Sequence, residues 1–129
     1  MRINRDTLRT DLIAKLQEIS GETVALCYQC GKCSAGCPLE REMGILPHRV
    51  IRLLQLGQVE EALAANAIWL CAACHTCAAR CPRGVDLSRT MEALRVILLR
   101  RGVPRAALGP PPPGAPQQTI VSFLRKYSS

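Results

Sequence analysis

The chain has 129 residues, of which 48% are hydrophobic, 21% charged and 3% aromatic, and its formal net charge at pH 7 is +7. This length suits one domain, or one domain with a tail. So few aromatic residues leave no stacking platform for single-stranded nucleic acid, and scattered basic residues more often form a solvated surface or a docking face for an acidic partner. The N-terminus has no apolar signal region and the chain has no apolar run of about 18 residues, so we expect a cytoplasmic protein without a transmembrane helix.

Residues 5–20 are predicted to form an amphipathic helix that packs on the core. Asn4 is placed to cap its N-terminus, and Gly21 follows its last turn. The apolar residues that recur at helical spacing are Leu8, Leu12, Leu16 and Ile19.

All eight cysteines lie in two runs of one form, C-x2-C-x2-C-x3-C-P. The first run contains Cys27, Cys30, Cys33 and Cys37, followed by Pro38, and the second contains Cys71, Cys74, Cys77 and Cys81, followed by Pro82. Bacterial ferredoxins hold [4Fe–4S] clusters with this spacing. Three closely spaced thiolates can wrap around three irons of a cube, while the fourth points away. The sequence therefore predicts two [4Fe–4S] clusters.

The spacing also predicts which cysteines share a cluster. In two-cluster ferredoxins with this spacing, the fourth cysteine of each run ligates the other cluster. Cluster 1 is therefore expected to take Cys27, Cys30, Cys33 and Cys81. Cluster 2 is expected to take Cys71, Cys74, Cys77 and Cys37. This crossed ligation would join the two halves of the chain.

Zinc and disulfides are the alternative uses of so many cysteines. Four thiolates around zinc would not explain the third cysteine at the same short spacing, nor the prolines that end both runs. Disulfides are disfavoured because nothing marks the chain as secreted. Two clusters, each about −2 with its thiolates, would reduce the net charge to roughly +3, so the basic excess is weak evidence for nucleic-acid binding.

Residues 38–70 favour helices over the short alternating strands of small β-α-β-β-α-β ferredoxins. A helix is predicted over 47–57, because it opens on proline and closes on glycine. A second, short helix is expected at about 58–66, with two glutamates in its first turn. The apolar residues of the first helix are Val50, Ile51, Leu53 and Leu54.

Several residues in and near the runs could adjust the cluster environment. Gly31 and Gly36 would let backbone N–H groups approach cluster sulfurs. Trp69 would pack over a cluster and limit access of water, or simply fill the core. His75, between two cysteines, would hydrogen-bond a sulfide or couple a proton to reduction, or merely fill the loop.

A third helix is predicted after the second run, capped by Asp86, running to Arg101 and ended by Gly102. Its apolar stripe consists of Leu87, Met91, Leu94 and Leu98, and Val96, Ile97 and Leu99 widen it. So wide an apolar surface predicts burial on more than one side, with part of it facing another subunit.

The C-terminal region has a different composition. Residues 109–116, Gly-Pro-Pro-Pro-Pro-Gly-Ala-Pro, predict a stiff, extended linker. Apolar residues at helical spacing follow it, at Ile120, Phe123, Leu124 and Tyr127. Residues 105–129 are therefore expected to form a Pro-rich linker and a docking segment outside a domain at 1–104. Whether 117–129 dock on a neighbouring subunit or fold back on this domain stays open.

From about Leu8 to Gly102 the chain resembles the small iron–sulfur protein of heterodisulfide reductase, its C subunit. The resemblance rests on Cys-x-Gln-Cys-Gly-x-Cys at 27–33, Cys-Pro at 37–38, Pro-x-Arg-x-Ile at 47–51 with Leu-Gly at 56–57, Trp69, the second cysteine run, and Met-x-Ala-Leu-Arg at 91–95. It implies an all-α fold, an α-helical ferredoxin, with [4Fe–4S] clusters on both runs.

The resemblance also implies a non-catalytic electron-transfer subunit of an oxidoreductase complex. In that family, electrons pass from the A subunit, which contains flavin and iron–sulfur clusters, through the C subunit to the catalytic B subunit. Noncubane clusters of the B subunit cleave a disulfide such as the coenzyme M–coenzyme B heterodisulfide. Nothing in the sequence looks like a catalytic nucleophile–base pair.

Two alternative functions stay open. One is a free ferredoxin-like electron carrier, against which the wide apolar face argues. The other is the iron–sulfur module of another dehydrogenase complex. A succinate-type module would need an extra [2Fe–2S] domain, for which no cysteines remain.

Overall fold

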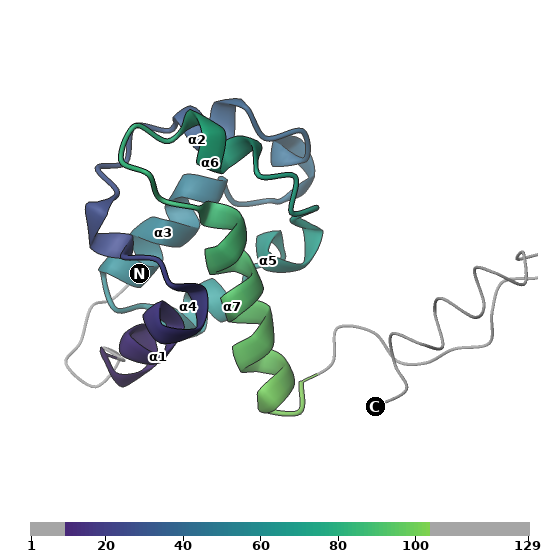
Figure 1. The fold of residues 1–129 in the computed structure, drawn as a ribbon. Coiled ribbons are helices and arrows are strands. Elements are labelled where there is room, and N and C mark those ends of the chain that lie inside the picture. The colour runs from purple at the N-terminus through teal and green to yellow at the C-terminus, as the bar shows by residue number, and fades with distance from the viewer. Residues whose placement is uncertain (1–9, 104–129) are drawn as a thin grey trace, which may run out of the picture.

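The computed structural model describes residues 10–103, and these residues form helices and no strand (Figure 1). In chain order the elements are α1 (Thr10–Ser20), the 3-10 turn η2 (Val24–Leu26), α2 (Lys32–Ala35), the 3-10 turn η3 (Glu40–Glu42), α3 (Pro47–Gln55), α4 (Val59–Ala64), α5 (Ala67–Leu70), α6 (Thr76–Arg80) and α7 (Leu87–Arg100). The predicted all-α fold is confirmed for this part of the chain.

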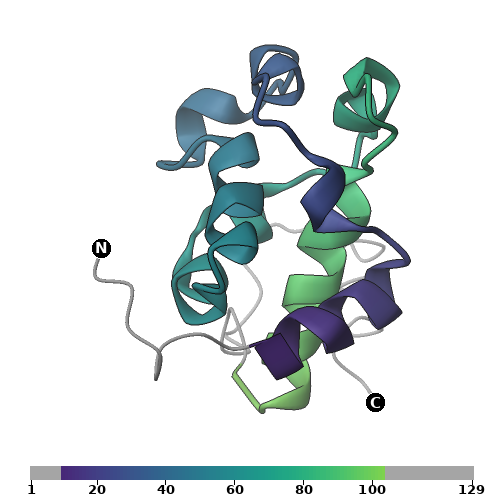
Figure 2. The same ribbon diagram turned by 90° about the vertical axis from the view of Figure 1, so that its left-hand side faces the viewer.

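Helix α7 is the longest helix within residues 10–103, and most of the other helices contact it. It runs from the cysteine loops at the top of Figure 1 to the opposite end of the domain, and α1, α3, α4, α5 and α6 all pack against it. Figure 2 shows α1 crossing its lower half, with α3 and α4 on the other side. The predicted burial of this helix on more than one side is therefore confirmed, although Leu99 near its end is exposed.

Local signals set most helix ends where the sequence predicts them. Pro47 occupies the first turn of α3, where its missing N–H costs no hydrogen bond. Gly57 follows α3 with φ +74°, a left-handed conformation that glycine adopts without a steric penalty. The short helix expected at 58–66 is α4, and the four-residue α5 after it was not predicted.

The hydrophobic core lies below the cysteine loops and joins the two halves of the chain. Its fully buried large residues include Leu16 from α1, Leu54 from α3, Val59 from α4, Ile68 from α5 and Leu94 from α7. Each such side chain contributes about 1.5–3 kcal/mol relative to an exposed one. The core thus fixes the scaffold from which both cysteine loops project.

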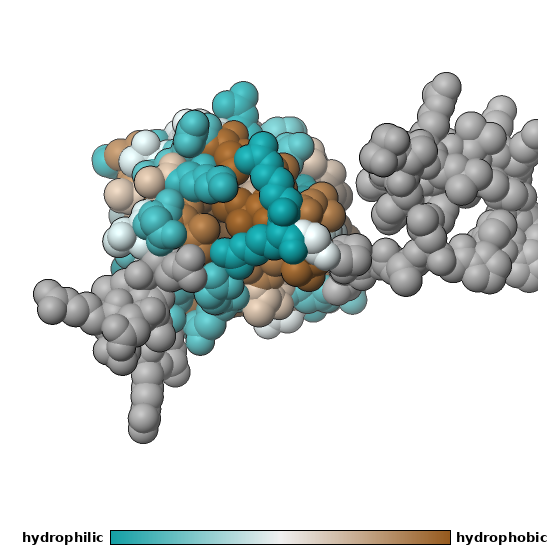
Figure 3. Space-filling model, turned by 90° about the horizontal axis from the view of Figure 1, so that it is seen from below, coloured by the Kyte–Doolittle hydropathy of each residue, from teal (hydrophilic) through white to brown (hydrophobic). Residues whose placement is uncertain are grey.

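The end of the domain away from the cysteines exposes apolar surface. Figure 3 views this end and shows a hydrophobic area framed by long hydrophilic side chains. Leu99, in the last turn of α7, and Val103, just beyond it, are 55% and 49% exposed. None of the helices within residues 10–103 is long and apolar enough to pass through a bilayer. Residues 5–9 of the first predicted helix, and the linker and docking segment at 105–129, lie outside the described residues.

Candidate functional site

The two cysteine runs have the same backbone conformation at equivalent positions. Gln29 and Ala73 precede the second cysteine of each run, with φ +64° and +53°. Gly31 and His75 follow that cysteine, with φ +76° and +57°. Each run then continues into a short helix, α2 or α6, that begins one residue before its third cysteine. The chain therefore contains an internal repeat, and its alternating left-handed residues suit loops whose N–H groups surround an anion.

These two loops lie against each other at one end of the domain. Helices α2 and α6 are in contact and stand side by side at the top of Figures 1 and 2. At Gly36, which follows α2, an added Cβ would lie 2.5 Å from both Cδ and Nε of Arg80 in α6. Glycine at 36 thus allows the Arg80 side chain to lie close to the backbone, and the approach of its N–H group to a cluster stays a prediction.

A pocket between the loops contains thiols from both runs. It extends down to Leu87 and Met91 of α7, which form part of its apolar floor. Its cysteines are Cys33 and Cys37 from the first run and Cys71, Cys74 and Cys77 from the second. They line the pocket without converging on one point: among residues 10–103, no three His, Cys, Asp or Glu side chains could hold a single metal ion. Cys37 therefore shares a pocket with the three closely spaced cysteines of the other run.

The last cysteine of the second run lies near the first loop. Arg83, two residues after Cys81, donates from Nε to the carbonyl of Leu26 at 3.3 Å. Slight desolvation, then Cys30 and more weakly Cys81, raise the pKa of the exposed Tyr28 hydroxyl. Both observations place this end of the second run beside the start of the first.

Some of the thiols are held in surroundings that change their acidity. Burial raises the pKa of the Cys33 and Cys71 thiols above the ordinary value, against weaker opposing hydrogen bonds. At Cys74, hydrogen bonds from Thr76 lower the thiol pKa. Thiols must lose their protons to bind iron, and the positive charge of the metal can offset the cost of burying thiolates. Eight soft donors, none of them in a disulfide, fit iron–sulfur clusters chemically.

Other groups already donate to these sulfurs. Nε2 of Gln29 donates to Cys27 Sγ at 3.4 Å, and the backbone N–H of Val85 donates to Cys81 Sγ at 3.3 Å. Such bonds stabilise negative charge on sulfur, and reduction of a bound cluster would increase that charge.

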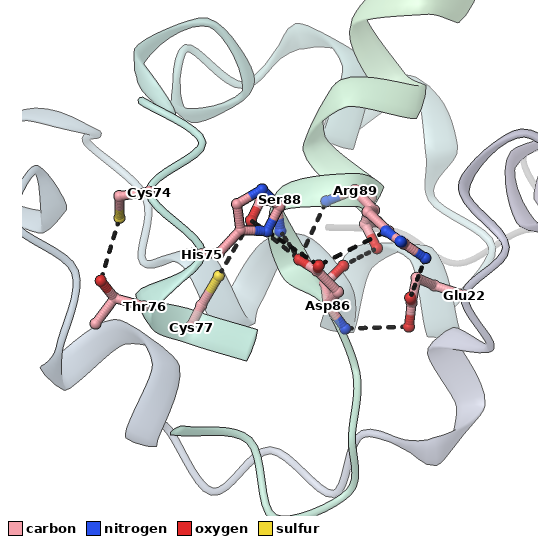
Figure 4. Close-up of polar contacts among 9 residues, drawn as sticks. Glu22, Cys74, His75, Thr76, Cys77, Asp86, Ser88 and Arg89 are labelled. Carbon is pink, nitrogen blue, oxygen red and sulfur yellow. Dashed lines mark hydrogen bonds and ion pairs between the residues drawn. The ribbon is translucent and has the colours of Figure 1, made fainter. Parts of the chain in front are cut away.

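A polar network on the first turn of α7 reaches Cys77 through Ser88 (Figure 4). The Asp86 carboxylate caps the helix by accepting from the N–H groups of Ser88 at 3.0 Å and Arg89 at 3.3 Å. Nδ1 of His75 lies 3.1 Å from both Asp86 Oδ2 and Ser88 Oγ. Ser88 Oγ in turn lies 3.7 Å from Cys77 Sγ. The N-cap at Asp86 was predicted, whereas the link through Ser88 to a cysteine was not.

The charge on Asp86 is stabilised within this network. Burial raises the pKa of its carboxyl, but the hydrogen bonds from Ser88, Arg89 and His75 outweigh this and leave the pKa below its ordinary value. The Glu22 carboxylate accepts from the Asp86 N–H at 3.0 Å and lies 3.8 Å from the Arg89 guanidinium. His75 and Ser88 thus both contact an ionised carboxylate, that of Asp86.

Neither Trp69 nor His48 lines the pocket. Trp69 is half-buried against the hydrophobic core, as expected for core filling, and its covering of a cluster stays a prediction. His48, in the first turn of α3, contacts the first loop: its Nδ1 lies 2.7 Å from the hydroxyl of Ser34, next to Cys33.

Comparison with known proteins agrees with this geometry. A model of the 4Fe-4S dicluster domain matches residues 26–86, which include both cysteine runs. The chain is 33% identical over 108 residues to the iron–sulfur C subunit of the CoB–CoM heterodisulfide reductase of Methanopyrus kandleri, covering 78% of this chain and 56% of the relative. It is 34% identical over 93 residues to the C subunit of the ferredoxin:CoB–CoM heterodisulfide reductase of Methanosarcina mazei, covering 72% and 57%.

A third relative, the iron–sulfur C 2 subunit of the CoB–CoM heterodisulfide reductase of Methanocaldococcus jannaschii, is 36% identical over 81 residues, covering 63% of this chain and 43% of the relative. The chain spans about half the length of these curated relatives. Its α-helical fold, its repeated cysteine loops and the matched domain together show an iron–sulfur protein that carries a 4Fe-4S dicluster domain, binds two [4Fe–4S] clusters and is related to the C subunit of heterodisulfide reductase.

Proposed function

We propose that this chain relays electrons inside a heterodisulfide reductase-type complex, between a flavin-containing A subunit and a disulfide-reducing B subunit. The observation that carries the proposal is the pair of facing cysteine loops on a helical scaffold, in a chain whose relatives are named as C subunits of such reductases. Each bound cluster would supply a one-electron couple, and the protein would hold, insulate and orient it.

The proposed ligands follow the crossed scheme. Cys27, Cys30, Cys33 and Cys81 would hold cluster 1, and Cys71, Cys74, Cys77 and Cys37 would hold cluster 2. The shared pocket of Cys37 with Cys71, Cys74 and Cys77 supports the second set. The contact of Arg83 with Leu26 supports the first set, because it brings Cys81 toward the first loop.

The scaffold supports a relay more than a catalytic role. Leu87 and Met91 of α7 give the pocket an apolar floor that would keep water from a cluster. The exposed Leu99 and Val103, with the hydrophobic surface in Figure 3, favour contact with a partner protein over a freely diffusing carrier. The reducing cytoplasm, where thiols remain available to iron, is the proposed location. Residues 117–129 are proposed as a further docking segment.

Serine substitutions would test the crossed ligation in the purified complex, prepared without oxygen. Cys37→Ser is expected to change the electron paramagnetic resonance signal that Cys74→Ser changes, and Cys81→Ser the signal that Cys30→Ser changes. If Cys37→Ser instead altered the same signal as Cys30→Ser, each run would hold its own cluster.

Flavin-dependent reduction of both clusters in the assembled complex would test the relay itself. The wild-type chain should contain about eight irons and eight acid-labile sulfides. A complex that reduces its disulfide at the wild-type rate with a cluster missing from this chain would remove the relay proposal.

A further inference from the structure

Ser88 places a buried hydroxyl group next to a cysteine of the second run. Its side chain is on the first turn of α7, the residue is 2% exposed, and its Oγ lies 3.7 Å from Cys77 Sγ, within the range of hydrogen bonds to sulfur. The position is fixed by the backbone, because the Ser88 N–H is held by the capping carboxylate of Asp86. A buried hydroxyl so held cannot turn to solvent for a partner.

The direction of this hydrogen bond follows from the protons available. A thiolate bound to iron has no proton, so Cys77 can only accept. The ionised Asp86 can also only accept, and its Oδ1 lies 3.0 Å from Ser88 Oγ. His75 Nδ1 can carry a proton and donate it to Asp86 Oδ2, 3.1 Å away. Because Asp86 then accepts from His75 and from two backbone N–H groups, the single hydroxyl proton of Ser88 is available to Cys77.

The backbone of His75 suggests that its side chain is needed here. It adopts a left-handed conformation at φ +57°, where the equivalent residue of the first loop is Gly31. This conformation strains a residue that carries a Cβ, whereas glycine adopts it freely, so the surroundings must hold the histidine in place. Its ring contacts Asp86 and Ser88 and so holds the Ser88 hydroxyl between a carboxylate and a sulfur.

We propose that Ser88, oriented by His75 and Asp86, donates a hydrogen bond to Cys77 Sγ and thereby raises the reduction potential of cluster 2. Reduction adds negative charge to the cluster and its sulfurs, so a donor to a ligating sulfur stabilises the reduced form more than the oxidised form. Ser88 is a positioning and tuning residue, and the inference rests on the proposed ligation of cluster 2 by Cys77.

A redox titration of the full complex, followed by electron paramagnetic resonance, would test this role. Ser88→Ala should reduce the equilibrium constant for reduction of cluster 2 by up to about tenfold, which is about 59 mV for a one-electron couple. Cluster 1 should titrate as in the wild type. Ser88→Thr keeps a hydroxyl and should restore most of the potential. Thr90→Val is the matched control, because Thr90 is a buried hydroxyl on α7 that donates to the Asp86 carbonyl instead.

The same data separate this inference from the proposed function. Full iron content with an unchanged cluster 2 potential in Ser88→Ala would overturn the role of Ser88 and leave the relay standing. If Ser88→Ala lost iron, His75→Gly would decide, since it copies Gly31 of the first loop. This variant should also lower the cluster 2 potential, and an unchanged value would overturn the inference. A wild-type chain without two clusters would instead refute the proposed function.

Discussion

Replacing Asp86 with alanine should destabilise the domain through helix α7. The carboxylate accepts N–H groups from Ser88 and Arg89, which are among the unpaired donors of the first turn. Losing such a cap costs about 1 kcal/mol. The side chain also accepts from His75 at 3.1 Å, and losing this bond adds roughly another 1 kcal/mol. The expected total is about 2 kcal/mol, because α7 packs on five other helices and cannot fray without them.

This loss should appear as faster unfolding of the cluster-loaded protein. If the cap is absent from the transition state, about 2 kcal/mol accelerates unfolding roughly 30-fold. Trp69 is the only tryptophan, so its fluorescence after anaerobic mixing with urea reports the process. Asp86→Asn is the matched control, since asparagine caps a helix as well as aspartate and loses only the charge. The reasoning fails if Asp86→Ala unfolds within threefold of the wild type, or if Asp86→Asn unfolds as fast as Asp86→Ala.

Two further predictions concern the first loop. Gly36→Ala should cost under about 1 kcal/mol, because the exposed Arg80 side chain can move away from the new methyl group. In an Arg80→Ala background the same change should become neutral or stabilising by about 0.4–1 kcal/mol, and a double-mutant cycle in urea measures this; an equal cost in both backgrounds contradicts the contact. Burial, then Arg49, lowers the pKa of His48, so the unfolded chain binds this proton more readily. The contribution of His48 to the free energy of unfolding is fully present above about pH 6.5 and declines as the pH falls through that value. His48→Gln should therefore flatten the dependence of the urea midpoint on pH between about 7.5 and 5.5, and an unaltered slope would refute it.

Local chemistry explains why much of the fold could be predicted from the sequence. Pro47 and Gly57 bound α3, and Asp86 and Gly102 bound α7, because each acts through its own backbone or a neighbour within one turn. The facing cysteine loops follow from the repeated spacing. By contrast, α5 has only four residues, too few to show a helical period.

The remaining features depend on contacts between distant parts of the chain. Ser88 lies 11 residues from Cys77, and a serine after an N-cap has no pattern that points to a sulfur. The left-handed conformations of Gln29, Ala73 and His75 were also not predictable, because glycine is the usual signal for that region. These conformations are imposed by the folded loops and not by the residue types.

The two loops share left-handed residues at equivalent positions, so the side chains around them are an important source of any difference between the two clusters. Where the first loop has Gly31 and a serine–histidine pair formed by Ser34 and His48, the second has His75 and Ser88 backed by an ionised carboxylate. Two similar loops with different neighbouring side chains would give their clusters different reduction potentials. An electron would then reduce one cluster in preference to the other. In this way a duplicated motif can acquire a preferred direction of electron transfer without any change to its cysteines.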